Sequence, residues 1–393
     1  MIVRQFLQWL RTASAGDRAD ATGALARAYL YSDLSPDDRA AAEGAMLMLL
    51  DDPSPLVRRA LADVFAGSDC APPAVVHALA SDQPDIAAPI LERSPLLLDA
   101  DLVDTVAVSS GDMQVAIAKR PALPRAVSAA IAEVGTAAAC LVLLENEQAD
   151  IAPFSLDRIV ARHGHLAVIR GALLARDDLP APTRQALVAK LSETLASFVA
   201  AREWLSDDRA RRVVKEACEK ATVTLAAGAP EPEVRPLVRH LCQSGQLTAG
   251  LVLRALLSGH LRLFEEALAE LSGMPLTRVS AIIYDGSSGA FRALYGKAGL
   301  PASTYPAFRE AVAAIQESGF VGDVGGATRL KRRMIERVLT RCEREQLGDI
   351  EPLLTLLRRF ATEAAREEAR LFCDELAARD IGGRDSTRRL AAA

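Results

Sequence analysis

The segment LLDDPSPLVRRALADVFA, residues 49–66, contains the strongest evidence for the fold. Its Asp52-Pro53 pair predicts the end of one apolar helix, because proline disfavours the helical conformation of the residue before it. Ser54 and Pro55 then suit the N-cap and the first position of a second helix. The segment therefore predicts two helices joined by a tight turn.

The residues upstream of this segment predict where the first helix starts. Ser35 is a good N-cap, and Pro36 fits the first helical position. Asp37 and Asp38 place negative charge at the end of the helix where its dipole favours anions. We therefore expect a helix over Pro36–Leu50, which makes the whole stretch from Ser35 to Phe65 a helical hairpin.

Apolar residues that end the first helix of such a hairpin recur along the chain. Their spacing is 25 to 29 residues, and a shorter second series has a spacing of 26. Recurrence of buried positions and caps at a fixed period is typical of stacked repeats. It predicts an all-α solenoid of helical hairpins of about 25–30 residues, with an irregular helical bundle as the alternative. The recurring residues are Leu50, Leu79, Val106, Ile131, Ile159 and Leu187, then Leu257 and Ile283.

Two stretches resemble known families. An Asp-Pro turn followed by a Val-Arg pair and small residues resembles the HEAT-repeat pattern, here Asp52, Pro53, Val57, Arg58, Ala60 and Ala62. Residues 253–301 resemble an alphaproteobacterial family of proteins with a domain of unknown function, and the likeness extends more loosely over most of the chain. This resemblance implies a bacterial helical-repeat protein with no catalytic residues to transfer.

Composition agrees with helices and limits the partners. Half of the 393 residues are hydrophobic and only 4% are aromatic, so the apolar mass is Ala, Leu and Val, which suits closely packed helices. The net charge of −5 excludes a general attraction to nucleic acid or anionic lipid. The N-terminal sequence lacks an export-signal pattern, and no apolar run approaches the roughly 20 residues that cross a bilayer. We therefore expect a cytoplasmic protein.

Changes in helix length and in breaker content divide the chain into five regions. Charge blocks and longer helices begin near residue 192, and a breaker-rich stretch closes that region. The expected regions are a HEAT-like array over 1–191, a junction over 192–233, a second repeat-like region over 234–327, amphipathic C-terminal helices over 328–380 and a disordered tail over 381–393.

Motifs for catalysis, cofactors and metals are missing from the sequence. It has no zinc-protease, nucleophile-elbow or Walker A motif, so we expect neither an enzyme nor a cofactor. The six cysteines are scattered and are interpreted as reduced, mostly buried thiols. His163 and His165 flank a turn without further ligands beside them, which favours an exposed pair over a metal site. The glycine-rich stretch 319–326 could offer N–H groups to an anion, but an inter-helix linker is the better interpretation.

One stretch of strong positive charge is the candidate binding site. Between Arg329 and Gln346 there are seven basic and three acidic residues. Five arginines are spaced by three or four, so they share one face of a helix. This Arg stripe consists of Arg329, Arg333, Arg337, Arg341 and Arg344. It is either a solvated face paired with Glu363, Glu367 and Glu368, or a docking strip for an acidic partner.

These features together favour a non-catalytic scaffold or adaptor, regulatory in role, which binds a protein partner of unknown identity through the solenoid groove or the basic helix. Repeat solenoids present extended concave surfaces suited to this task. The alternative is a HEAT-like protein that binds nucleic acid with the same helix, and strongly salt-dependent retention on DNA would distinguish it. An unrecognised enzyme would need a deep pocket with perturbed acids.

Overall fold

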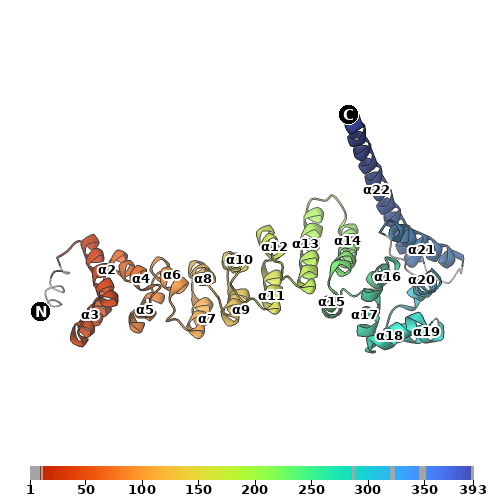
Figure 1. The fold of residues 1–393 in the computed structure, drawn as a ribbon. Coiled ribbons are helices and arrows are strands. Elements are labelled where there is room, and N and C mark those ends of the chain that lie inside the picture. The colour runs from red at the N-terminus through yellow and green to blue at the C-terminus, as the bar shows by residue number, and fades with distance from the viewer. Residues whose placement is uncertain (1–8, 10–11, 286–287, 319–323, 345–350, 391–393) are drawn as a thin grey trace. The chain divides into compact units, whose positions relative to one another are not determined.

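A computed structural model describes residues 9, 12–285, 288–318, 324–344 and 351–390. These residues form 21 α-helices and one short 3-10 helix, and none of them is assigned to a strand. The chain is therefore all-α (Figure 1). It divides into two compact units, Met1–Leu179 and Pro180–Ala393. Each unit is described by itself.

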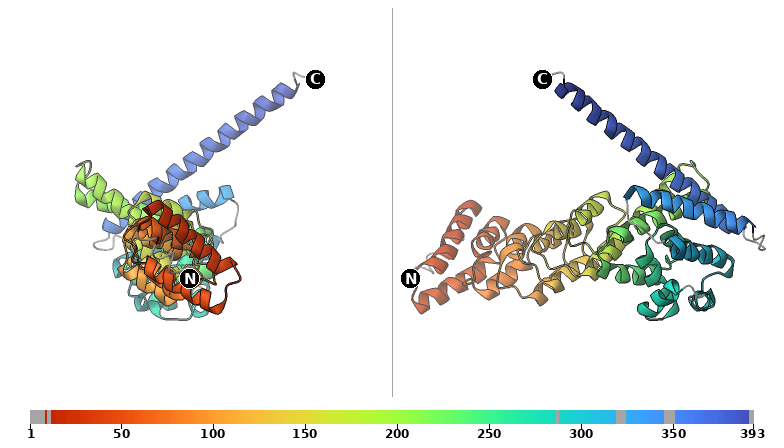
Figure 2. Two further views of the ribbon diagram at one scale, coloured as in Figure 1. Left: turned by 90° about the vertical axis from the view of Figure 1, so that its left-hand side faces the viewer. Right: turned by 45° about the vertical axis from the view of Figure 1, so that its right-hand side comes forward.

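The helices of the first unit pack in sequence order in two rows. In one row each of α2, α4, α6, α8, α10 and α12 contacts the next, and in the other α3 contacts α5 while α9 contacts both α7 and α11 (Figures 1 and 2). Such packing of near neighbours is consistent with a helical repeat. The helices are α2 (Ala15–Tyr31), α3 (Pro36–Leu49), α4 (Pro55–Phe65), α5 (Pro73–Ala80), α6 (Pro84–Arg93), α7 (Asp99–Val108), α8 (Gly111–Ala118), α9 (Arg125–Val134), α10 (Ala137–Glu145), α11 (Pro153–His163) and α12 (Ala167–Leu174).

The hairpin predicted at residues 35–65 is present as α3 and α4. Ser35 caps α3, because its Oγ accepts a hydrogen bond from the Asp38 backbone N–H at 3.2 Å. Ser54 precedes α4 but its side chain does not cap the helix. The turn is closed by Asp52 instead, whose Oδ1 accepts from the Ser54 backbone N–H at 2.8 Å. The Asp-Pro turn is thus held by the aspartate itself.

The predicted buried positions are largely confirmed. Leu79, Val106, Ile131 and Ile159 are all completely buried. Leu50 is only half-buried, because α3 ends one residue earlier and Leu49 points into the core. In the second unit the three remaining members of the series, Leu187, Leu257 and Ile283, are also buried.

Arginine side chains link neighbouring hairpins at their turns. Arg18 donates to both carboxylate oxygens of Asp52 at 2.9 and 2.8 Å. Arg58 does the same to Asp82 at 2.6 and 3.2 Å, and it also donates to the Asp52 carbonyl oxygen at 2.6 Å. The hydrogen bond from Arg18 is the largest reason why the pKa of Asp52 is lowered from its usual value. Asp52 and Arg58 therefore connect one helical hairpin to the next.

Later turns in the first unit use arginine in a related way. Arg120 donates to the carbonyl oxygens of Leu91 and Ser94, both at 2.7 Å. Arg162 donates to those of Ala132 and Gly135 at 2.8 and 2.7 Å. These carbonyls lie at the ends of α6 and α9, where no further helical turn satisfies them. The arginines thereby cap a helix of the preceding hairpin.

We predict that Arg58→Met lowers the free energy of unfolding by about 1–3 kcal/mol, since three hydrogen bonds to a charged group are lost and Asp82 is left partly buried. Arg27→Met is the control, because Arg27 is exposed in α2 and forms no ion pair with another described residue. We expect its effect to be within about 0.5 kcal/mol. Urea unfolding measures the free energy of unfolding of both variants. Equal losses would show that the hydrogen bonds of Arg58 at the turn contribute nothing to stability.

The second unit is built around a core of buried Leu, Val, Phe and Ala side chains contributed by α13 to α22. Here α14 packs along α13, α15 contacts α13 and α17, and α21 packs along α22 (Figure 2). The helices are α13 (Ala181–Ala201), α14 (Asp207–Gly228), α15 (Glu231–Gln243), α16 (Ala249–Leu257), α17 (Leu261–Ser272), α18 (Leu276–Tyr284), α19 (Ser288–Lys297), η1 (Ala302–Thr304), α20 (Tyr305–Ser318), α21 (Val324–Arg344) and α22 (Glu351–Leu390).

The structure departs from the expected regions at two places. Residue 191 lies inside α13, and the two units divide at Leu179 and Pro180 instead. The reason is that α13 packs on α14 and α15. The tail expected to be disordered from residue 381 is helical as far as Leu390, where it forms the last part of α22.

Two further properties bear on function. Among the described residues no helix is long and apolar enough to cross a membrane. The expectation of mostly buried cysteines is wrong, because Cys140 and Cys342 are buried but Cys70, Cys242 and Cys373 are exposed. These exposed thiols lie on the polar sides of their helices or in a turn, where scattered small residues are tolerated.

Candidate functional site

The Arg stripe lies on α21, and only part of it falls on described side chains. Those of Arg329, Arg333 and Arg344 lie outside the described residues. Arg341 is exposed, and its Nε lies 3.0 Å from Oε2 of Glu310, a carboxylate that is only 5% exposed. Arg337 is half-buried. Arg341 therefore compensates a buried charge on α20.

The three glutamates expected to pair with the stripe do form ion pairs, and neighbouring cations provide them. Lys331 Nζ lies 2.8 Å from Glu367, and Arg332 Nη1 lies 2.9 Å from Glu368. Glu363 turns instead toward the body of the unit, where it contacts other helices. The acidic face of α22 is thus used to pack α22 against α21 and against the core.

The contacts of Glu363 lie on the floor of a groove between α14, α16 and α22. This basic groove has a volume of about 990 Å³ and is lined by eight cations and three carboxylates. The cations are Arg209, Arg212, Lys220, Arg254, Arg358, Arg359, Arg366 and Arg370, and the carboxylates are Glu216, Glu363 and Glu367. This site cannot be recognised in the sequence, because its two walls are more than a hundred residues apart. The charge block at 207–212 was the only signal for it.

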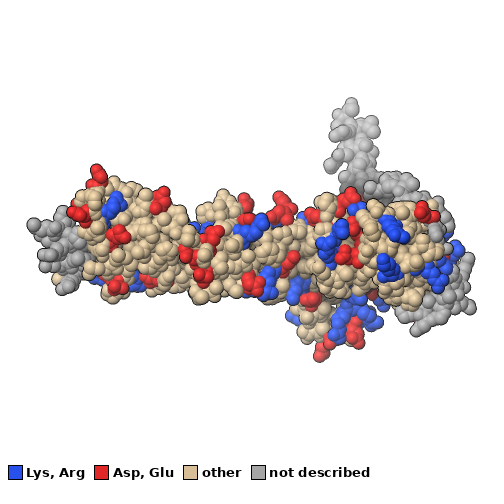
Figure 3. Space-filling view, turned by 90° about the horizontal axis from the view of Figure 1, so that it is seen from below, with Lys and Arg blue, Asp and Glu red and all other residues tan. Residues whose placement is uncertain are grey.

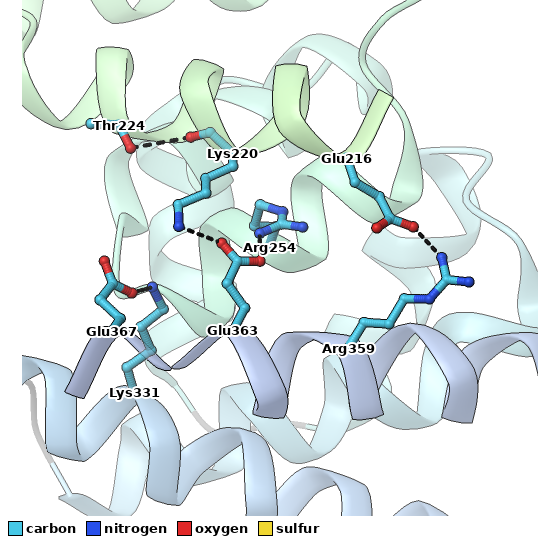
Figure 4. Close-up of polar contacts among 8 residues, drawn as sticks. All are labelled: Glu216, Lys220, Thr224, Arg254, Lys331, Arg359, Glu363 and Glu367. Atoms are coloured by element: carbon cyan, nitrogen blue, oxygen red, sulfur yellow. Dashed lines mark hydrogen bonds and ion pairs between the residues drawn. The ribbon is translucent and has the colours of Figure 1, made fainter. Parts of the chain in front are cut away.

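An ion-pair network holds the floor of the basic groove in place (Figure 4). Glu363 accepts from Arg254 Nη1 at 2.6 Å and lies 2.9 Å from Lys220 Nζ. Burial alone would raise the pKa of Glu363, but the bonds from Lys220 and Arg254 outweigh it and lower that pKa. Glu363 is therefore ionised at neutral pH and ties α22 to α14 and α16.

Arg254 is the most buried cation of the groove, at 7% exposure. Its guanidinium carbon lies 4.3 Å from the centre of the Phe360 ring, a cation–π distance. Its Nε is buried and has no hydrogen-bond partner in the structure. Arg254 therefore holds the floor of the groove through Glu363 and the Phe360 ring.

The rim of the groove carries positive charge that no carboxylate balances. Arg359 pairs with Glu216 across the groove (Figure 4). Arg209, Arg366 and Arg370 are exposed, and the structure gives none of them an ion pair with another described residue. Guanidinium groups bind carboxylate and phosphate through paired hydrogen bonds. This arrangement can bind an extended anion.

None of the other sequence candidates lines the groove. His163 is in α11, where its Nε2 lies 3.4 Å from the Gly135 carbonyl oxygen, and burial lowers its pKa. Within the described part of the chain no group of three or more His, Cys, Asp and Glu is placed to hold a metal ion. Residues 319–323 of the glycine-rich stretch lie outside the described residues, and 324–326 begin α21.

Comparison with known proteins identifies a family and nothing beyond it. No curated protein and no solved structure matches the chain. The model of one family matches residues 86–348, about two thirds of the chain, which include about half of the first unit and most of the second. The chain belongs to this family, which is described as an uncharacterised protein conserved in bacteria (DUF2336).

Proposed function

We propose that the protein is a non-catalytic, regulatory scaffold or adaptor that binds an acidic segment of a protein partner in the basic groove. The observation that carries this proposal is the surplus of cations along the groove, with three arginines at the rim that have no ion pair among the described residues. Desolvated arginines at a concave surface are frequent binding hot spots.

The fold supports this role. The two rows of helices in the first unit, together with the Arg18–Asp52 and Arg58–Asp82 pairs, support a HEAT-like solenoid as the architecture. Solenoids of this kind serve as binding platforms in which each repeat contacts its neighbours. We propose that the protein acts in the bacterial cytoplasm, where acidic segments of other proteins can reach the basic groove.

An acidic protein segment fits the groove better than nucleic acid does. The chain has a net charge of −5, and acidic and basic side chains are mixed over the face shown in Figure 3. A duplex would also meet the acidic side chains that are mixed among the basic ones beyond the groove, whereas a short segment needs only the groove itself. Three carboxylates among the cations also favour a partner that carries hydrogen-bond donors beside its negative charges.

The Arg stripe is a second docking candidate for the same partner. Its described member Arg341 already compensates Glu310, which makes its charge less available than that of the groove rim. Reversing Arg337 and Arg341 to Glu would therefore place like charges beside Glu310 and lower the melting temperature. Loss of binding by this double variant would be interpretable only where the fold is retained.

We predict that the triple reversal Arg209→Glu, Arg366→Glu and Arg370→Glu weakens binding of a fluorescein-labelled glutamate-rich peptide by at least about a hundredfold. The three side chains are exposed and have no ion pair among the described residues, so the melting temperature should change little. Added salt should weaken wild-type binding, because screening acts on charges at the rim. Fluorescence anisotropy measures the affinities.

The control is the triple reversal Arg27→Glu, Arg235→Glu and Arg278→Glu, which changes the net charge equally at exposed sites outside the groove. It should retain most of the affinity for the peptide. Equal loss in both variants would mean that total charge, not the groove, governs binding. Tighter binding of an unrelated DNA duplex than of the peptide would favour the nucleic-acid function instead. Affinity capture with mass spectrometry in the native organism would then name the partner.

A further inference from the structure

A second cavity of about 310 Å³ lies in the second unit between α13, α14 and the start of α16. This small cavity is distinct from the basic groove and shares no lining residue with it. Its volume is at the lower end of the range for pockets that bind small organic molecules. Apolar side chains form much of its wall, namely Ala189, Ala196, Val214, Leu241 and Leu251.

Two carboxylates line the cavity. Glu193 is exposed and pairs with Lys190, whereas Glu219 is buried in the apolar wall. Glu219 is 9% exposed, and its Oε1 accepts a hydrogen bond from the Thr248 hydroxyl at 2.9 Å. The structure gives Glu219 no ion pair with any other described residue. A carboxylate has about four acceptor positions, so most of its capacity is unused. Burial is the main reason that the pKa of Glu219 is raised.

The remaining polar groups of the cavity point to the charge of its ligand. Ser192, Cys218, Thr222 and Gln246 line it as uncharged groups. Lys215, Arg211 and Glu193 also line it and are exposed to solvent. Lys215 and Arg254 act on Glu219 through space but form no ion pair with it. A bound ammonium group in contact with the carboxylate would offset more of the cost of its burial. An anionic ligand would meet the carboxylate in a medium of low polarity and be repelled.

We propose that the small cavity binds an organic ammonium ion, with its protonated amine on Glu219 and its apolar body against Ala196, Val214 and Leu251. The carboxylate selects the charge of the ligand, and the wall selects its apolar shape. This site is independent of the proposed binding of an acidic partner, since it uses other residues and a ligand of opposite charge.

The test compares three probes of one shape, cyclohexylammonium, cyclohexanol and cyclohexanecarboxylate, by isothermal titration calorimetry on the full chain at neutral pH. We expect saturable binding of the ammonium ion, binding of the alcohol at least about tenfold weaker, and no binding of the carboxylate. Glu219→Gln should weaken ammonium binding at least about tenfold. Glu270→Gln, which removes a charge on α17, should leave it unchanged.

A second variant guards against loss of the fold. Ala196→Leu fills the cavity without touching the carboxylate, and it should also weaken ammonium binding while the alcohol loses affinity in parallel. Circular dichroism and the melting temperature establish that each variant is folded. Equal affinities for the three probes, unchanged ammonium binding in both variants, or no saturable ammonium binding by the wild type would each overturn the proposal. A Glu219→Gln variant that loses only stability, with probe binding intact, would assign Glu219 to capping α16.

Discussion

Ile131→Ala should lower the free energy of unfolding by about 2–5 kcal/mol. Ile131 is completely buried in α9, between helices on both sides of its row, so truncation removes apolar contacts and leaves a cavity. The residue also belongs to the 25-to-29-residue series on which the repeat assignment depends. Urea unfolding followed by far-UV circular dichroism measures the change.

Val134→Ala on the same helix is the control, because Val134 is 48% exposed only three residues farther along. Its loss should be below about 1 kcal/mol, since little apolar area is withdrawn from water there. Equal changes in the unfolding midpoint for both substitutions would mean that the recurring apolar residues do not mark the core. The 25-to-29-residue spacing would then not indicate a repeat. A reduced slope with denaturant would show instead that the units of the chain unfold separately.

Glu363→Gln should destabilise the second unit by about 2–3 kcal/mol at neutral pH, because Arg254 is left buried without its carboxylate. The side chain of Arg254 is 8% exposed and that of Glu363 is 25% exposed, so solvent screens the pair only in part. The same change should loosen α22 on α14 and α16 and so weaken peptide binding in the basic groove. Glu193→Gln, in an exposed pair with Lys190, is the stability control.

The effect of Glu363→Gln should depend on pH in a defined direction. The pKa of Glu363 is lowered in the folded protein, so its contribution to stability is fully present above the ordinary value of 4.5. That contribution is lost as the pH falls through the lower folded-state pKa. The difference between wild type and variant should therefore be constant near neutrality and shrink below the ordinary value. A difference that grew in acid would mean that Glu363 is not held by its cations.

The prediction of the fold succeeded where local sequence decides structure. Proline, serine and aspartate at 35–38 and 52–55 specify helix starts and a turn through the bonds of their own backbone and side chains. The spacing of buried Leu, Val and Ile then follows, because every repeat must cover the same face of its neighbour. Leu50 shows the limit of this prediction. The helix ends one residue earlier than expected, so Leu49 is buried in place of Leu50.

The candidate site could not be predicted in the same way. In the sequence, Arg254 is a single cation within an apolar helix. Its burial depends on Phe360 and Glu363, which lie about a hundred positions later in the chain. The Arg stripe is visible because helical spacing is local, whereas the pairing of Glu367 with Lys331 depends on how α21 and α22 lie together.

The sequence by itself determined an all-α chain, the hairpin of α3 and α4, most of the buried positions in the series and the presence of two long C-terminal helices. Only the tertiary structure decided which charges compensate one another, where the two units divide, and that the walls of the basic groove and of the small cavity come from separate helices. The physical reason is the separation along the sequence of the residues that interact. Helix caps and periodicity are fixed by residues within a few positions of one another, but charge pairing and cavities depend on contacts between segments that meet only when the chain has folded.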